Sequence, residues 1–149
     1  LGSALVHAMI SMFILLTAEL LVTGNVHWTI VWLPVVLLPL VLLLLGLGWF
    51  FASLGTFLRD VGQMIGLVMQ ALMFLSPIFY PISIIPEKLR FLYKLNPISN
   101  IVEDMRGIII FGQFPNWHWT VMGTLVGIAV FQAGYFWFKK TKGGFADVL

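Results

Sequence analysis

The amino-acid sequence predicts an all-α, polytopic membrane protein with four transmembrane helices. Two short re-entrant or interfacial helices are expected between the third and the fourth. Sixty per cent of the 149 residues are hydrophobic and 9% are charged, so a water-soluble domain of this size would lack a polar coat. The mean hydropathy of +1.03 agrees. The uncharged stretches are also long enough to cross about 30 Å of hydrocarbon.

The first predicted span covers residues 4–22 and contains a single acid, Glu19. A carboxylate inside a membrane span is a functional-site hypothesis by default. Glu19 also lies within a turn of the span's end, where its side chain can reach the headgroups, and both interpretations stay open. Residues 23–25 then have turn chemistry, and Trp28 suits the aromatic belt at a membrane interface.

The second predicted span covers residues 30–57, none of whose side chains is formally charged. Its second half contains small residues that allow another helix to approach closely, namely Gly46, Gly48, Ala52 and Gly55. Arg59 and Asp60 follow at once. The third span, over residues 61–80, is therefore expected to fold back on the second as a tight antiparallel hairpin.

Proline residues end the third span. A residue that precedes proline is driven out of the α-helical region of backbone space. Ser76-Pro77 and Tyr80-Pro81 are two such pairs, only four residues apart. They predict an irregular segment after the third span.

Two short amphipathic helices are predicted after this segment. Pro86 suits the first position of a helix over 86–95, whose leucines recur at helical spacing. Asn96 as N-cap and Pro97 as first helical residue start a second helix, over 97–111. Both segments are too short or too charged to cross a membrane, so we expect them to be re-entrant or to lie in the interface.

The fourth predicted span covers residues 117–138. It ends in aromatic residues and is followed directly by three lysines, Lys139, Lys140 and Lys142. Lysines against a span favour the cytoplasmic side, so we expect a cytoplasmic C-terminus. Arg59 is then cytoplasmic and residues 81–116 lie outside. Basic residues are equally numerous on the two sides, and it is the lysines beside the span that decide the orientation.

Common catalytic and nucleotide-binding patterns are missing from the sequence. There is no cysteine and no G-x-x-x-x-G-K-[ST], H-E-x-x-H or G-x-S-x-G pattern. No catalytic residue and no metal site are predicted, because the three histidines all fall near the ends of predicted spans. The basic residues form no run interleaved with aromatic residues, so no nucleic-acid partner is expected.

Several motifs in order resemble those of the type-2 ATP-binding-cassette exporter permeases. The motifs are F-x-R-D from Phe57 to Asp60, S-P-I-x-Y-P from Ser76 to Pro81, and Asn96-Pro97 with Arg106 downstream. The closing KTKGGFADVL is similar to the C-terminus of the polysaccharide and O-antigen export branch. The resemblance covers essentially the whole chain, as the last four of six expected spans.

The resemblance implies a permease subunit that exports lipid-linked, O-antigen-like polysaccharide across the bacterial inner membrane. It implies a homodimer of permeases, two ATPase subunits, and a glycan carried on undecaprenyl diphosphate within the membrane lipid. No cofactor is expected in this chain, because ATP and Mg²⁺ would bind the partner ATPase. The chain is expected to be the C-terminal part of its permease, without the coupling helix of the family.

Candidate site residues follow from these roles. Arg59 and Asp60 would form the cytoplasmic turn, and residues 82–112 would correspond to gate helices on the external side. Helix breaks in the gate region are assigned to Ser76, Pro77, Pro81, Pro86, Asn96 and Pro97. Candidate aromatic residues of the substrate path are Phe74, Phe79 and Tyr80, followed by Trp49 and Phe51. Ordinary packing is the alternative for each aromatic side chain.

Three other functions stay open at this point. A type-2 permease for teichoic acid or for a hydrophobic drug would have the same fold. A membrane enzyme acting on a lipid-linked sugar would need a cluster of carboxylates or histidines, for which Glu103, Asp104 and His118 are the only loose candidates. A purely structural membrane subunit is the third.

Overall fold

The computed structural model describes residues 2–25, 27–58, 60–76, 78, 80, 84–88, 90, 93 and 96–143, with the backbone alone at Leu5, Thr23 and Pro97. The described residues contain helices and no strand, which confirms the all-α fold class. The helices are α1 (Gly2–Thr23), the 3₁₀-helix η1 (Trp28–Trp32), α2 (Leu33–Phe57), α3 (Val61–Leu75), α5 (Pro97–Ile110) and α6 (Trp117–Thr141). Within the described part, Gly2–Val22, Trp28–Phe57 and Trp117–Thr141 are long and apolar enough to cross a membrane.

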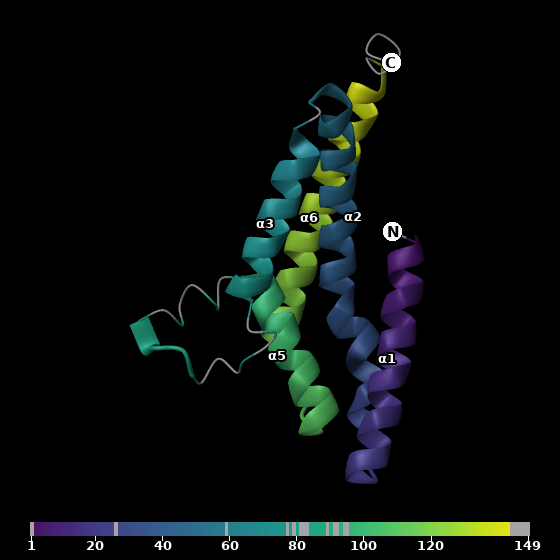
Figure 1. Ribbon diagram of the computed structural model, residues 1–149, viewed down its shortest axis with the longest axis vertical. Helices are drawn as coiled ribbons and strands as arrows, with labels where there is room; N and C mark the ends of the chain where they lie inside the picture. Colours follow the sequence, from purple (N-terminus) through teal and green to yellow (C-terminus); the bar gives the residue numbers. More distant parts are fainter. Residues whose placement is uncertain are drawn as a thin grey trace.

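The helices α2 and α6 form the main packed pair and run in the same direction (Figure 1). The helix α3 returns antiparallel to α2 after residues 58–60, and α5 continues in the direction of α3. The helix α1 lies beside the half of α2 nearest η1. Its half-buried residues Met12, Leu16 and Glu19 share one face, and Met12 packs against the core. Glu19 is therefore on the packed face of α1.

The contact between α2 and α6 depends on glycines. A methyl group added at Gly134 would overlap the backbone carbonyl of Gly46. A methyl group at Gly127 would lie 3.0 Å from the carbonyl oxygen of Pro39. Any larger side chain at these two α6 positions would force the helix backbones apart. Small residues have this role in membrane helix pairs because close backbone approach gains van der Waals contact.

The positions at which α2 and α6 contact each other recur every seven residues. About two turns beyond Gly46 and Gly134, the hydroxyl oxygens of Ser53 and Thr141 lie 2.5 Å apart in a hydrogen bond. The matching positions are Pro39, Gly46 and Ser53 on α2 and Gly127, Gly134 and Thr141 on α6. A seven-residue period on both helices is the period of a left-handed parallel pairing.

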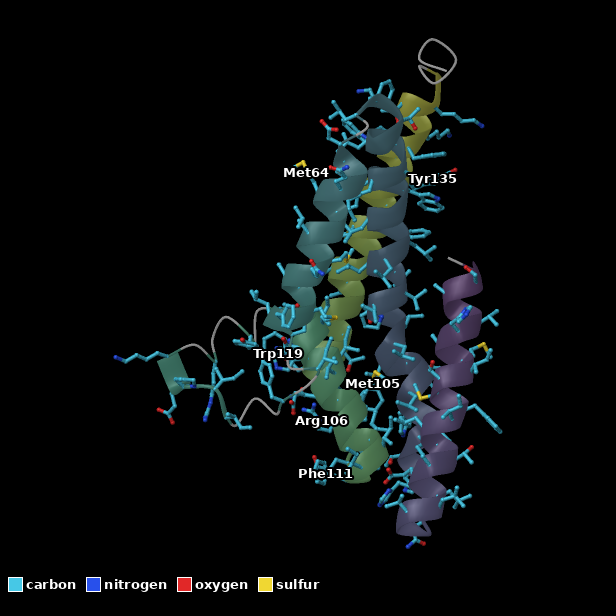
Figure 2. All side chains as sticks on the ribbon, in the orientation of Figure 1. Met64, Met105, Arg106, Phe111, Trp119 and Tyr135 are labelled. Atoms are coloured by element: carbon cyan, nitrogen blue, oxygen red, sulfur yellow. The ribbon has the colours of Figure 1, made fainter. Side chains whose placement is uncertain are left out.

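A buried apolar cluster holds α5 against the beginning of α2. It consists of Leu33, Val36, Ile101, Ile108 and Ile109. The buried hydroxyl of Thr29, on η1, donates a hydrogen bond of 2.9 Å to the carbonyl oxygen of Ile108. Figure 2 shows Met105, which packs against this cluster, and Arg106, which points away from α2. One face of α5 is therefore apolar core and the other is polar.

The third predicted span is shorter than expected. The sequence predicts a helix over residues 61–80, whereas α3 ends at Leu75. The reason is that Ser76 precedes proline and has extended backbone angles, φ −97° and ψ 140°. Fifteen residues of α-helix reach about 22 Å, which is less than the roughly 30 Å of a hydrocarbon core.

The two predicted short helices differ in how much of them is described. The second, expected over 97–111, is α5 (Pro97–Ile110). Of the first, expected over 86–95, residues 87, 88, 90 and 93 have helical backbone, and 89, 91, 92, 94 and 95 lie outside the described residues.

Candidate functional site

Asn96 joins the end of α3 to the beginning of α5. Its side-chain oxygen accepts a hydrogen bond of 3.0 Å from the Ile98 amide, which caps the helix as the sequence predicts. Its side-chain NH₂ donates a bond of 3.2 Å to the hydroxyl of Ser76, which is 1% exposed. A single side chain therefore stabilises the first turn of α5 and ties it to the residue where α3 stops.

Arg106 makes a second connection between the same two segments. One guanidinium nitrogen donates to the carbonyl oxygen of Ile78 at 3.4 Å, and the other lies 2.6 Å from the carboxylate of Glu103. We name the Asn96–Ser76 and Arg106–Ile78 hydrogen bonds the clasp. Both bonds of the clasp are polar, and one is long. The clasp therefore contributes less stability than the packing of the apolar face of α5 against the core.

Tyr80 lies beside the clasp. Its hydroxyl donates to the Phe74 carbonyl at 2.9 Å and lies 3.0 Å from the hydroxyl of Tyr93. Because the Tyr80 hydrogen goes to Phe74, Tyr93 is the donor in the second bond. The two rings meet edge to face, with centroids 6.3 Å apart. Tyr80 thus links the end of α3 to the segment that contains Tyr93, and the Phe74 side chain beside it is 65% exposed.

Asp104 attaches α5 to the beginning of α6. Its Oδ1 accepts a hydrogen bond of 3.1 Å from the amide of Asn116, and the Thr120 hydroxyl donates one of 3.1 Å to the carbonyl oxygen of Asn116. Burial raises the pKa of the Asp104 carboxyl, while hydrogen bonding acts in the opposite direction. Sequence reasoning missed this contact. The only signal was a polar residue, Asn116, directly before the apolar stretch of α6.

The aromatic candidates on α2 lie against other aromatic rings. The ring of Trp49 is 4.9 Å from that of Phe131 and 5.1 Å from that of Tyr135, both on α6. The ring of Phe51 meets that of Phe50 at 5.5 Å. A lining role for Trp49 and Phe51 stays a prediction.

The other predicted site residues divide into two groups. Asp60 is exposed at the start of α3, where its carbonyl accepts from the amides of residues 63 and 64. The Pro86 carbonyl accepts from the Arg90 amide at 3.2 Å, and Pro97 is the first residue of α5. Four predicted residues lie outside the described residues, namely Arg59, Pro77, Phe79 and Pro81.

The three residues that the enzyme hypothesis would need make separate contacts with other residues and do not form one cluster. Glu103 pairs with Arg106 and Asp104 holds the beginning of α6, while the His118 ring lies edge-on to Trp119 at 5.8 Å. In the part of the chain that the structure describes, no three His, Cys, Asp or Glu side chains gather into a group that could hold a metal.

Removing the whole Asn96 side chain should destabilise the protein by more than removing its hydrogen bond to Ser76 alone. Asn96→Ala loses both the cap and the Ser76 bond, and a lost N-cap costs about 1 kcal/mol of unfolding free energy. Asn96→Ser keeps a capping oxygen but is too short to reach Ser76, so it should cost less. Thermal unfolding in detergent measures the difference. Equal melting temperatures for the two variants would show that the cap contributes nothing.

Comparison with known proteins places the chain among transport proteins. The family model for the ABC-2 type transporter matches residues 1–110. Two curated relatives from Klebsiella pneumoniae are each named O-antigen export system permease protein RfbA. They are 27% identical over 128 residues and 25% identical over 117 residues, which is 85% and 78% of this chain. These alignments cover 48% and 45% of the relatives, so the chain spans about half their length.

Proposed function

Because this chain belongs to the ABC-2 type transporter family, we propose that it is part of the permease subunit of an exporter for lipid-linked polysaccharide. The exporter would use ATP to move an O-antigen-like glycan across the bacterial inner membrane. The observation that carries the proposal is the family match over residues 1–110, together with two relatives named as O-antigen export permeases. Among the described residues, three apolar helices of membrane-spanning length agree with a multi-pass membrane protein.

The proposed assembly has two permeases and two ATPase subunits. ATP and Mg²⁺ bind the ATPase subunits, so this chain supplies the path and not the hydrolysis. The cargo is a glycan on undecaprenyl diphosphate. The turn at residues 58–60 and the lysine-rich end of α6 face the cytoplasm, and the clasp faces outward, in keeping with the positive-inside rule.

In the proposed opening step, the α2–α6 contact stays intact while the weaker contact between α3 and α5 separates. The α2–α6 pair is held by backbone approach at Gly46 and Gly134 and by the Ser53–Thr141 bond, so it moves as one unit. The end of α3 is held to α5 by the clasp, which consists of two polar bonds, one of them long and exposed. ATP-driven tilting of the permease halves therefore parts α3 from α5 and leaves α2 and α6 together.

Aromatic side chains suit a polymer that must slide. Rings can stack on sugars without binding any one sugar tightly. Exposed Phe74 and the neighbouring Tyr80 are the described candidates at the end of α3. The side chains of α3 carry no formal charge, which suits a long neutral or varied glycan.

Glycan-dependent ATP turnover tests this function. The full-length permease should co-purify with an ATPase, and lipid-linked glycan should raise the turnover of the complex in lipid vesicles. Undecaprenyl phosphate without glycan is the control and should have little effect. Stimulation by teichoic acid or by a hydrophobic drug instead would assign the chain to another substrate. A permease that binds no ATPase would contradict the proposal altogether.

A further inference from the structure

A pocket lies where α2, α5 and α6 meet. Its polar end is formed by Asn100 and Asp104 of α5 with Thr120 of α6. Its other walls are apolar and include Pro39 and Val126. We name it the α5–α6 pocket. It is separate from the clasp, and none of the candidate path aromatics that the structure describes lines it.

The lining of the pocket changes from polar to apolar along α6. Its lining begins at Trp119 and Thr120, in the first turn of the helix, and ends at Val126. Seven residues of helix correspond to about 10 Å. Trp117 and Trp119 suit an aromatic belt at the membrane interface, so the polar end lies at headgroup depth and the apolar end within the hydrocarbon. A ligand that fits this gradient has a polar head and an apolar chain.

The polar end carries a negative charge that its bonded partners leave unbalanced. The Asn116 amide that donates to Asp104 is neutral, and the Thr120 hydroxyl at the same end of the pocket donates to the carbonyl oxygen of Asn116. The basic residue nearest in sequence, Arg106, forms its ion pair with Glu103 at 2.6 Å. Burial raises the pKa of the Asp104 carboxyl, the Glu103 charge raises it further, and no cation among the described residues lowers it. Trp119, 38% exposed, adds a ring on which a cation can rest.

We propose that the α5–α6 pocket binds a phospholipid whose headgroup carries a primary ammonium group. The ammonium lies beside the Asp104 carboxylate and the Trp119 ring, and an acyl chain follows the apolar wall toward Val126. Charge complementarity selects this occupant, because an anionic headgroup would be repelled by Asp104. The mostly apolar wall offers few partners for the hydroxyls of a sugar chain. The bound lipid would brace α5 against α6.

Lipid competition tests the proposal without any measurement of export. The full-length permease with its ATPase subunits is placed in nanodiscs of phosphatidylglycerol containing a minor fraction of phosphatidylethanolamine. Lipids that stay bound after release are counted by native mass spectrometry. The wild-type protein should retain phosphatidylethanolamine about five- to tenfold above its share of the nanodisc, the range expected for one partly desolvated cation contact.

Two variants distinguish the effect of the Asp104 charge from the effect of the pocket's apolar space. Asp104→Asn keeps an oxygen that can accept from Asn116, so α5 stays attached to α6, but the headgroup preference should disappear. Val126→Phe fills the apolar end and should lower retention of either lipid. Glu103→Gln removes a neighbouring acid that does not line the pocket and should leave the preference unchanged. An unchanged headgroup preference in Asp104→Asn, unchanged retention in Val126→Phe, or wild-type retention equal to the bulk composition would overturn the proposal. This experiment measures lipid retention and not glycan export. If the protein does not export glycan, the lipid-binding proposal is therefore unaffected.

Discussion

Gly134→Ala is expected to destabilise the protein strongly and to lower the amount that reaches the membrane folded. The added methyl group would overlap the carbonyl of Gly46, which is helix backbone and cannot rotate away as a side chain can. The two helices must then separate along their closest contact. Overpacking of this kind costs about 1–3 kcal/mol of unfolding free energy. Gly134→Val should cost more.

A matched control distinguishes this contact from the general effect of glycine in a helix. Gly55 lies on α2, the partner helix, and an added methyl group there meets no atom within 4 Å. Gly55→Ala should leave stability unchanged or raise it slightly, because alanine favours a helix over glycine by about 1 kcal/mol. Thermal unfolding of the purified variants gives the comparison. If Gly134→Ala and Gly55→Ala melt alike, the α2–α6 contact is not as close as the structure shows.

Composition and local rules were enough for the fold class and for several local features. A sequence that is 60% hydrophobic can form only a membrane protein, and its uncharged runs are helices in the structure. The capping rule located the beginning of α5 at Asn96 and Pro97, since the cap needs only the next two residues. The proline rule also predicts that Ser76 is not helical, which agrees with the end of α3 at Leu75, whereas a span over residues 61–80 does not. The local rule was the better guide to where α3 ends.

Features that join distant residues could not be predicted in the same way. Gly46 was recognised as a small residue, but its partner lies 88 positions later on α6, and a single sequence does not reveal that register. The bond from Asp104 to the Asn116 amide depends on how α5 lies against α6. Which aromatic rings line a path depends further on the second permease of the proposed homodimer. For Phe74, Tyr80, Trp49 and Phe51 a lining role therefore stays a prediction.

Crosslinking the clasp should stop export, whereas crosslinking the α2–α6 pair should not. The chain contains no cysteine, so an engineered pair has no competing thiol within it. One variant combines Ser76→Cys with Asn96→Cys, whose side chains meet at 3.2 Å in the clasp. The other combines Ser53→Cys with Thr141→Cys, whose hydroxyls are 2.5 Å apart. A short, reducible bifunctional thiol reagent joins either pair, and each variant before crosslinking is its own control.

The most direct test of the opening step is transport of lipid-linked glycan by these two crosslinked variants. Full-length permease and its ATPase subunits are placed in vesicles, and glycan that reaches the far face is measured before crosslinking, after it and after reduction. Export should fall at least tenfold when α3 is joined to α5 and return when the link is reduced, while joining α2 to α6 should leave it within about twofold. Continued export with the clasp crosslinked, or loss of export with only α2 and α6 joined, would contradict the proposed opening step.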